Sequence, residues 1–124
     1  MAEHLDFYKC EICGTIIQVF NRGDGELVCC GKPMTYIQPH TIENEMKEKH
    51  IPVFVSENKI QVGSVLHPMT EEHHIKFIET VSKDNKRIEV QFLSHNELPE
   101  MQITKNPNEI TPFEYCNIHG LWKG

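Results

Sequence analysis

The sequence lacks any long hydrophobic run, and no basic segment followed by an apolar stretch stands near its N-terminus. No run approaches the roughly 20 apolar residues that a membrane-spanning helix needs, so we expect neither a membrane span nor a signal peptide. An excess of positive charge is also lacking, because the 124 residues carry a formal net charge of -6. That charge argues against nucleic acid or an anionic membrane as the main partner. We therefore expect a cytoplasmic protein.

Cysteine is scarce and unevenly distributed. Four of the five cysteines lie in the N-terminal quarter of the chain, and the fifth lies near the C-terminus. Five is an odd number, and a reducing compartment disfavours disulfides, so metal ligation is the better use for these thiols. Histidine, by contrast, is overrepresented, with eight copies. These two residue types direct attention to metal sites.

Residues 1–37 are predicted to form one small metal-binding unit. Cys10-Glu11-Ile12-Cys13-Gly14 is a knuckle that presents two thiolates, and Cys29-Cys30 follows a strand–turn–strand pattern. Four thiolates that flank a hairpin predict one four-sulfur site, with two disulfides or buried thiols as the less favoured alternative. So short a segment buries little core, so the metal should supply much of its folding free energy.

The adjacent pair Cys29-Cys30 is unusual for such a site. Neighbouring side chains on extended backbone point to opposite faces, so both thiolates reach one ion only if the backbone kinks. Sulfur ligands suit iron and zinc equally well. The spacing of the cysteines therefore does not decide which of the two metals binds.

Residues 38–124 are predicted to form a second domain that is mostly β. Thr41 to Lys49 is rich in charge and favours one or two helical turns, which end at Ile51-Pro52. From Val53 onward short apolar segments recur between turn signals, and polar and apolar residues alternate over 87–92. About seven short strands with this rhythm indicate an antiparallel sandwich.

Several histidines lie at the predicted strand ends, and a cysteine–histidine pair lies close to the C-terminus. The candidate ligands are His50, His67, His73, Cys116 and His119. For any single histidine, an ordinary surface or core position is the commoner explanation, but five such residues favour a metal site. Four imidazoles and one thiolate suit a five-coordinate redox metal, iron or copper, with one position open.

The other histidines are expected to stay outside this site. His74 should point to the opposite face from its neighbour His73 if both lie on extended backbone. His4, His40 and His95 have no partner pattern and are interpreted as surface residues.

Four motifs together resemble desulfoferrodoxin, the two-iron class of superoxide reductase, over nearly the whole chain. They are Cys10-x-x-Cys13 with Cys29-Cys30; Glu48-Lys49-His50-Ile51-Pro52; His67-Pro68-Met69-Thr70-Glu71-Glu72-His73; and Tyr115-Cys116-Asn117-Ile118-His119-Gly120-Leu121-Trp122. The resemblance implies a desulforedoxin-like or rubredoxin-like domain with iron held by four cysteines. It also implies an immunoglobulin-like β-sandwich that carries a mononuclear Fe2+/Fe3+ centre.

The resemblance further implies roles for individual residues. His50, His67, His73 and His119 would be the equatorial ligands and Cys116 the axial thiolate. Glu48 would occupy the sixth position in the oxidised resting state, and Lys49 would lie beside the open face. The implied reaction is the one-electron reduction of superoxide to hydrogen peroxide, with a rubredoxin-type electron donor and a homodimeric enzyme. His74 and Phe77 depart from the family, which commonly has an aromatic residue and a tryptophan at these positions.

The charge of the substrate agrees with this interpretation. In a net negative protein, Lys47 and Lys49 beside a cationic iron would supply a local positive field, which can raise on-rates by about ten- to a thousandfold. Two rival functions remain at this point. One is a non-catalytic electron carrier that uses the four-cysteine iron, and the other is a zinc-binding module in which both sites are structural.

Overall fold

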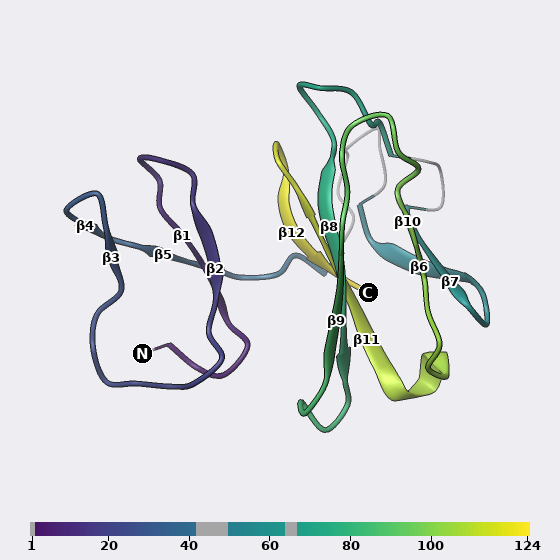
Figure 1. Cartoon of the computed structure of the whole chain (residues 1–124), viewed down its shortest axis with the longest axis horizontal. Helices are drawn as coiled ribbons and strands as arrows, with labels where there is room; N and C mark the ends of the chain where they lie inside the picture. The colour runs from purple at the N-terminus through teal and green to yellow at the C-terminus, as the bar shows by residue number, and fades with distance from the viewer. Residues whose placement is uncertain (1, 42–49, 64–66) are drawn as a thin grey trace. The chain divides into compact units, whose positions relative to one another are not determined.

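The computed structural model describes residues 2–41, 50–63 and 67–124. It divides into two compact units, Met1–Gln38 and Pro39–Gly124, which are considered separately (Figure 1). The described residues are mostly β, as predicted, and their one helical element is the 3-10 helix η1 (Pro107–Glu109). The helical turns predicted for Thr41 to Lys49 lie, apart from Thr41, outside the described residues. In the described ranges no helix is long and apolar enough to cross a membrane.

The N-terminal unit contains two small antiparallel sheets. β1 (Phe7–Lys9) lies between β2 (Ile16–Gln18) and β5 (Thr35–Ile37), and β3 (Val28–Cys29) pairs with β4 (Lys32–Pro33). Its buried apolar residues are few, namely Ala2, Phe7, Cys10 and Val19 among those described. Such a core is too small to stabilise a fold without help, which agrees with a structural contribution from a bound metal.

The kink expected at the adjacent cysteines is a tight turn. Cys30 and Gly31 form the two-residue connection between β3 and β4, with φ of 54° and 73°. Positive φ at both central residues is the signature of a type I′ hairpin turn. This backbone conformation removes the alternation of an extended strand, so Cys29 and Cys30 both turn toward one point.

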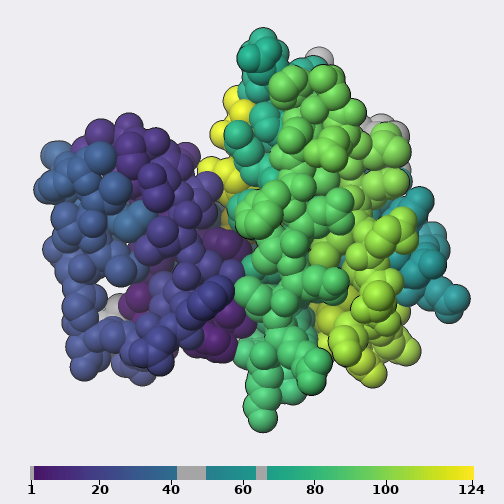
Figure 2. All heavy atoms as spheres, in the orientation of Figure 1, coloured from purple at the N-terminus to yellow at the C-terminus, as the bar shows by residue number. Residues whose placement is uncertain are grey.

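The C-terminal unit is built from two antiparallel sheets. The first has the order β10-β7-β6, from β6 (Pro52–Ser56), β7 (Lys59–Val62) and β10 (Glu100–Gln102). The second has the order β12-β11-β8-β9, from β8 (Ile75–Ser82), β9 (Ile88–Phe92), β11 (Ile110–Cys116) and β12 (Gly120–Lys123). The strand content agrees with the predicted sandwich. The turn between β8 and β9 projects from the body of this unit (Figures 1 and 2).

One hydrophobic cluster fills this unit. It consists of Ile60, Val62, Ile75, Ile78, Leu93, Met101, Ile103, Ile110 and Cys116, with the half-buried Met69 packed against it. Residues from both sheets contribute, so their apolar faces are removed from water together. Cys116 belongs to this cluster and is fully buried, so a rigid packed core fixes the position of its thiol.

Candidate metal centres

The four N-terminal cysteines converge, as their spacing predicts. The sulfur atoms of Cys10, Cys13, Cys29 and Cys30 all lie within 4.8 Å of one another, and none of the chain's five cysteines forms a disulfide. The Cys13 and Cys29 sulfurs are 3.6 Å apart, and those of Cys29 and Cys30 are 3.9 Å apart. Four sulfurs about 2.3 Å from one ion would be about 3.8 Å apart in a tetrahedron. The cluster therefore fits a single four-coordinate iron or zinc ion.

Local backbone structure shapes the first half of this site. The Gly14 amide donates to the Cys10 carbonyl over 2.8 Å, and the Cys13 amide donates to the Cys10 sulfur over 3.5 Å. Gly14 has φ of 82°, a left-handed conformation that glycine adopts without steric cost. The chain can therefore reverse directly after the second cysteine and continue through Thr15 into β2.

Thr15 distinguishes one thiol from the others. Its hydroxyl lies 3.1 Å from the Cys13 sulfur, and hydrogen bonds from Thr15 are the main reason that the Cys13 pKa falls to about 6. The Cys29 pKa instead rises to about 12, chiefly through its hydrogen bonds to Cys10 and Cys13. The lowered pKa of Cys13 favours its thiolate, whereas the raised pKa values of Cys29 and Cys30 favour their thiols. A bound metal would displace the protons of Cys29 and Cys30.

The second cluster is a closed ring of imidazoles. Neighbouring ring centroids are 4.6 Å apart for His50–His67, 4.8 Å for His67–His73, 5.1 Å for His73–His119 and 4.7 Å for His119–His50. All four contacts are edge-on, with interplanar angles from 69° to 86°. Each ring therefore touches two neighbours, and the ligand atoms of these histidines and Cys116 lie within 4.8 Å of one another.

The distances in this ring fit ligands of one metal ion. Nε2 of His50 lies 3.0 Å from Nε2 of His67 and 3.0 Å from Nδ1 of His119. Two nitrogens about 2.1 Å from a metal and at right angles to each other would be about 3.0 Å apart. The Cys116 sulfur lies 4.0 Å from Nδ1 of His119 and supplies the fifth ligand atom. The donor set of four nitrogens and one sulfur suits iron, as expected.

Neighbouring groups orient these ligands. Nδ1 of His67 donates to the Pro68 carbonyl over 2.8 Å, which leaves Nε2 with the lone pair that a metal requires. The His50 ring stacks on Trp122, whose indole N–H donates to the His119 carbonyl over 3.1 Å. One buried tryptophan thus supports two of the imidazoles.

The short turn between β11 and β12 presents two ligands together. Cys116 is the last residue of β11 and pairs with Gly120, the first residue of β12. Gly120 has φ of 88°, which lets three residues close the turn and places His119 beside Cys116. The cysteine–histidine pair that the spacing indicated is therefore one structural element.

Other predicted residues lie outside the two clusters. His74 is buried, its Nδ1 donates to the Thr70 carbonyl over 2.9 Å, and it is not among the clustered ligands. Phe77 is buried and stacks on Tyr115 with an interplanar angle of 11°. Glu48 and Lys49, the two predicted catalytic residues, lie outside the described residues, as does Lys47.

Several residues near the ligands gave no distinct signal in the sequence. His40, interpreted as a surface residue, is exposed, but its ring packs on Trp122 and its backbone pairs with β12. Glu114, two positions before Cys116, is fully buried. Asn117 lies between two ligands and bonds to the segment that carries His73. Glu114 and Asn117 are close to Cys116 in the sequence, but only the fold shows the burial of Glu114, the bonds of Asn117 and the approach of His40.

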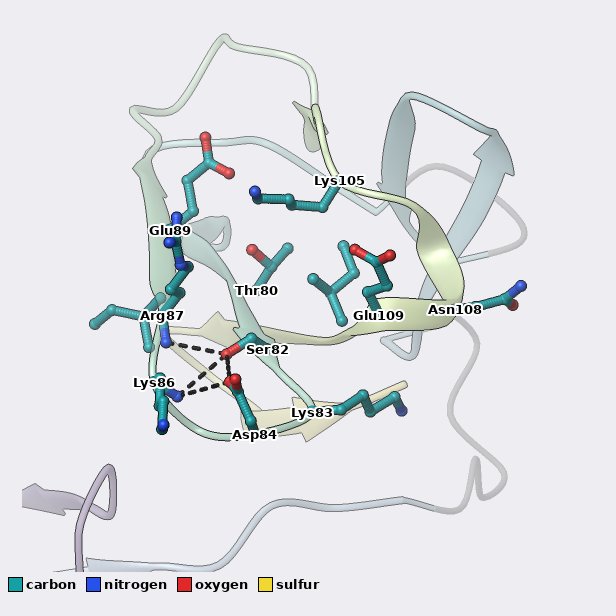
Figure 3. A pocket seen from close by; sticks show the side chains of 12 residues that line it. Thr80, Ser82, Lys83, Asp84, Lys86, Arg87, Glu89, Lys105, Asn108 and Glu109 are labelled. Atoms are coloured by element: carbon teal, nitrogen blue, oxygen red, sulfur yellow. Dashed lines mark hydrogen bonds between the residues drawn. The ribbon is translucent and has the colours of Figure 1, made fainter.

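A hollow of about 930 Å³ lies elsewhere in the C-terminal unit, between the β8–β9 turn and η1 (Figure 3). Lys105, Glu89 and Glu109 line it, so its charges are mixed, and it contains none of the candidate ligands. Ser82, on its wall, ends β8, whereas His73 precedes the start of that strand. Eight strand residues span about 25 Å, so this hollow is remote from the ligand ring.

Comparison with known proteins agrees with the geometry. Residues 42–124 match the family model "Desulfoferrodoxin", and residues 2–37 match "Desulfoferrodoxin, N-terminal domain". A desulfoferrodoxin of Syntrophotalea carbinolica is 46% identical over 125 residues, which cover 98% of this chain and 97% of that protein. A desulforedoxin of Megalodesulfovibrio gigas is 53% identical over 34 residues, 27% of this chain and 92% of that protein.

A solved structure extends this likeness to the whole fold. The superoxide reductase from Treponema pallidum superposes with a TM-score of 0.75 at 27% sequence identity, covering 98% of each chain. The resemblance inferred from the four motifs is thereby confirmed, as are a mostly β fold and two metal centres of four cysteines and of four histidines with one cysteine. With both of its units matched, the chain belongs to the desulfoferrodoxin family.

Proposed function

We propose that this chain is a superoxide reductase, an oxidoreductase that transfers one electron and two protons to superoxide and releases hydrogen peroxide. The observation that carries the proposal is the closed ring of four imidazoles with the Cys116 thiol, whose ligand atoms lie within 4.8 Å of one another. Iron bound there would supply a one-electron donor with room for a small anion. The matched family and the Treponema pallidum structure support the same activity.

The charge of the ligand set favours an anionic substrate. Four neutral imidazoles add no charge, so a divalent ion held by them and by the Cys116 thiolate keeps one net positive charge. The whole chain has a formal charge of -6 and would otherwise repel superoxide. A local positive centre can still attract the anion, because the field close to a site outweighs a diffuse net charge at greater distance.

Glu48 and Lys49 complete the proposed catalytic machinery. Both directly precede His50, which is fully buried and belongs to the ligand ring. We assign to Lys49 the attraction of superoxide and the orientation of a proton-donating water, and to Glu48 the role of a carboxylate that would bind the oxidised iron. Sequence position and charge support these roles.

We assign the four-cysteine iron site to a first domain, residues 1–37, and the reduction of superoxide to a second domain, residues 38–124. No disulfide joins the cysteines of the first domain, which suits a reducing cytoplasm. Large apolar side chains are exposed in this domain, including Ile12, Phe20 and Val28. Such side chains suit contact with a rubredoxin-type electron donor and with a second copy of the chain in a homodimer.

The decisive experiment combines metal analysis with spectra of the reduced and oxidised protein. We expect two irons per chain and, on oxidation, a thiolate-to-iron absorption band separate from that of the four-cysteine iron. Superoxide should be consumed with formation of hydrogen peroxide and without evolution of oxygen. Zinc in the histidine site would rule out the reductase, and iron in the four-cysteine site alone would favour the electron carrier.

A further inference from the structure

His73 lies on irregular backbone. In the described part of the chain, residues 67–74 contain no strand or helix, and β8 begins only at Ile75. A ligand on such backbone is not held by the hydrogen bonds of a sheet. Its position must come from specific contacts on either side, because a loosely held ligand would weaken the metal site.

Thr70 holds His73 from within the same segment. The Thr70 amide donates to the His73 carbonyl over 2.9 Å, and the His73 amide donates to the Thr70 hydroxyl oxygen over 3.1 Å. The Thr70 hydroxyl lies 3.2 Å from the His73 carbonyl. These bonds form a local turn of four residues. They define its shape but do not connect it to the rest of the ligand ring.

Asn117 makes that connection. Its side-chain oxygen accepts from the His74 amide over 3.0 Å, and its side-chain NH2 donates to the Glu72 carbonyl over 3.0 Å. Its backbone amide donates to the His74 carbonyl over 3.2 Å. These three hydrogen bonds hold Glu72 and His74, the residues on either side of His73. Asn117 is itself the residue next to Cys116.

The irregular pairing of β8 and β11 explains why a side chain is needed here. Their ladder shifts register between Tyr115 and Cys116, and its last pair is Cys116 with Ile75. Beyond that point regular pairing no longer joins the two segments. An asparagine offers one acceptor and a two-hydrogen donor in a single planar group, which matches the amide of one residue and the carbonyl of another.

We propose that Asn117 is a positioning residue that fixes His73 relative to the Cys116 thiolate. It couples the residue His73 to the residue Cys116, which are 43 positions apart in the sequence, through one side chain. The inference rests on the assignment of both residues as ligands in the proposed function. Loss of the bridge should loosen the angle between the imidazole and the thiolate without removing a ligand atom.

The test compares iron-loaded, full-length Asn117→Leu and Asn117→Asp with the unsubstituted protein. Leucine has a similar volume and neither polar group, whereas aspartate keeps the acceptor for the His74 amide and loses the donor to Glu72. We expect iron transfer from the histidine site to a chelator to become about 10- to 100-fold faster in Asn117→Leu, with a smaller increase in Asn117→Asp. The thiolate-to-iron band of the oxidised protein should shift.

Two controls separate positioning from general stability. The four-cysteine iron in the same molecule should keep its spectrum and its rate of release. Asn58→Ala removes an exposed asparagine side chain that accepts from the Ser56 hydroxyl over 2.8 Å, and it should change neither the rate of iron release nor the thiolate-to-iron band.

A third variant tests the other contact of His73. Thr70→Val removes the hydroxyl that accepts from the His73 amide and should also accelerate iron release.

A lower melting temperature with an unchanged band and unchanged iron release would overturn the proposal, because Asn117 would then be merely structural. If Asn117→Leu fails to fold, the isosteric Asn117→Asp provides the test. Wild-type iron release and a wild-type band in Asn117→Asp would likewise overturn the proposal. The rate of iron release and the thiolate-to-iron band are both measured without turnover of superoxide. A protein that does not reduce superoxide but shows these responses would contradict the proposed function and leave the role of Asn117 intact.

Discussion

The imidazole of His50 stacks on the indole of Trp122, with ring centroids 4.9 Å apart and an interplanar angle of 17°. Both side chains are almost completely buried. The same indole donates a hydrogen bond to the His119 carbonyl, so a residue that cannot itself bind metal holds two ligands of the ring. A substitution of Trp122 therefore tests how the ligands are held in place without removing a ligand.

Trp122→Phe should keep most of the stacking area and lose the hydrogen bond to His119. We expect a loss of at least about 1 kcal/mol in unfolding free energy, because a buried hydrogen bond contributes about that much and the smaller ring also leaves a cavity. Iron in the histidine site should also exchange faster. Chelator kinetics measure the exchange, and the four-cysteine iron is the internal control. Equal effects on both irons would indicate general destabilisation instead.

His73 and His74 are adjacent but should respond in opposite ways to alanine substitution. His73 belongs to the ligand ring, whereas His74 bonds to Thr70 and its ring lies 6.0 Å from that of His95. We expect His73→Ala to lower the iron content of the histidine site and His74→Ala to leave one iron there. Metal analysis per chain gives the answer. Loss of iron from His74→Ala would contradict the ligand assignment.

Cys116→Ser and His119→Ala should separate two kinds of ligand. Serine in place of Cys116 removes the thiolate, so the thiolate-to-iron band of the histidine site should disappear and its reactivity should change. His119→Ala leaves the thiolate in place and should mainly weaken metal binding. Absorption spectra of the oxidised proteins distinguish the two outcomes. A persistent band in Cys116→Ser would contradict the assignment of Cys116 as the thiolate ligand.

Thr15→Val should raise the Cys13 pKa from about 6 towards the ordinary thiol value of 9.0. A lowered pKa favours the folded metal-free protein above the unfolded value, and this contribution is lost as the pH falls through about 6. Alkylation of metal-free Cys13 at neutral pH should slow by about three- to tenfold, because the thiolate is the nucleophile. Thr15→Ser should restore the rate. An unchanged rate in Thr15→Val would show that the hydroxyl does not matter.

Gly31→Ala should destabilise the four-cysteine site through the backbone alone. Gly31 has φ of 73°, and no atom lies within 4 Å of an added Cβ, so steric contact is not the cause. A left-handed conformation costs an L-residue about 1–2 kcal/mol. We expect lower iron retention in this site, measured by absorption during thermal unfolding. Gly23→Ala, at a glycine with an open surrounding and no positive φ, is the matched control and should behave like the wild type.

Lys49→Ile should slow the second-order reaction with superoxide at low salt and leave both irons in place. The expected decrease is about tenfold or more, since local charge can alter on-rates by ten- to a thousandfold. Pulse-generated superoxide at two ionic strengths provides the measurement. Lys105→Ile, in the remote hollow, changes the net charge equally and should have little effect. Equal rates for the two variants would argue against local steering.

Much of this protein could be inferred from sequence because its chemistry is local. The four N-terminal cysteines and the Cys116–His119 pair have ligand spacings that limit where their atoms can lie. Alternating strands and turn residues predicted a mostly β chain, which the structure confirms. The prediction that only one of the neighbours His73 and His74 is a ligand agrees with the structure, although both lie on irregular backbone and not on the extended strand that the argument assumed.

Tertiary structure decided how these pieces meet. Strand pairing and packing across long stretches of sequence bring Asn117 to Glu72 and His74, Trp122 to His50, and His40 to Trp122, and residue type and spacing do not encode these contacts. The approach of Cys29 and Cys30 to one point needed the positive φ of a type I′ turn, a conformation that the sequence allowed but did not require. The sequence by itself thus determined which atoms can bind metal, whereas the tertiary structure decided which residues hold those atoms in place, because positioning depends on contacts between distant segments.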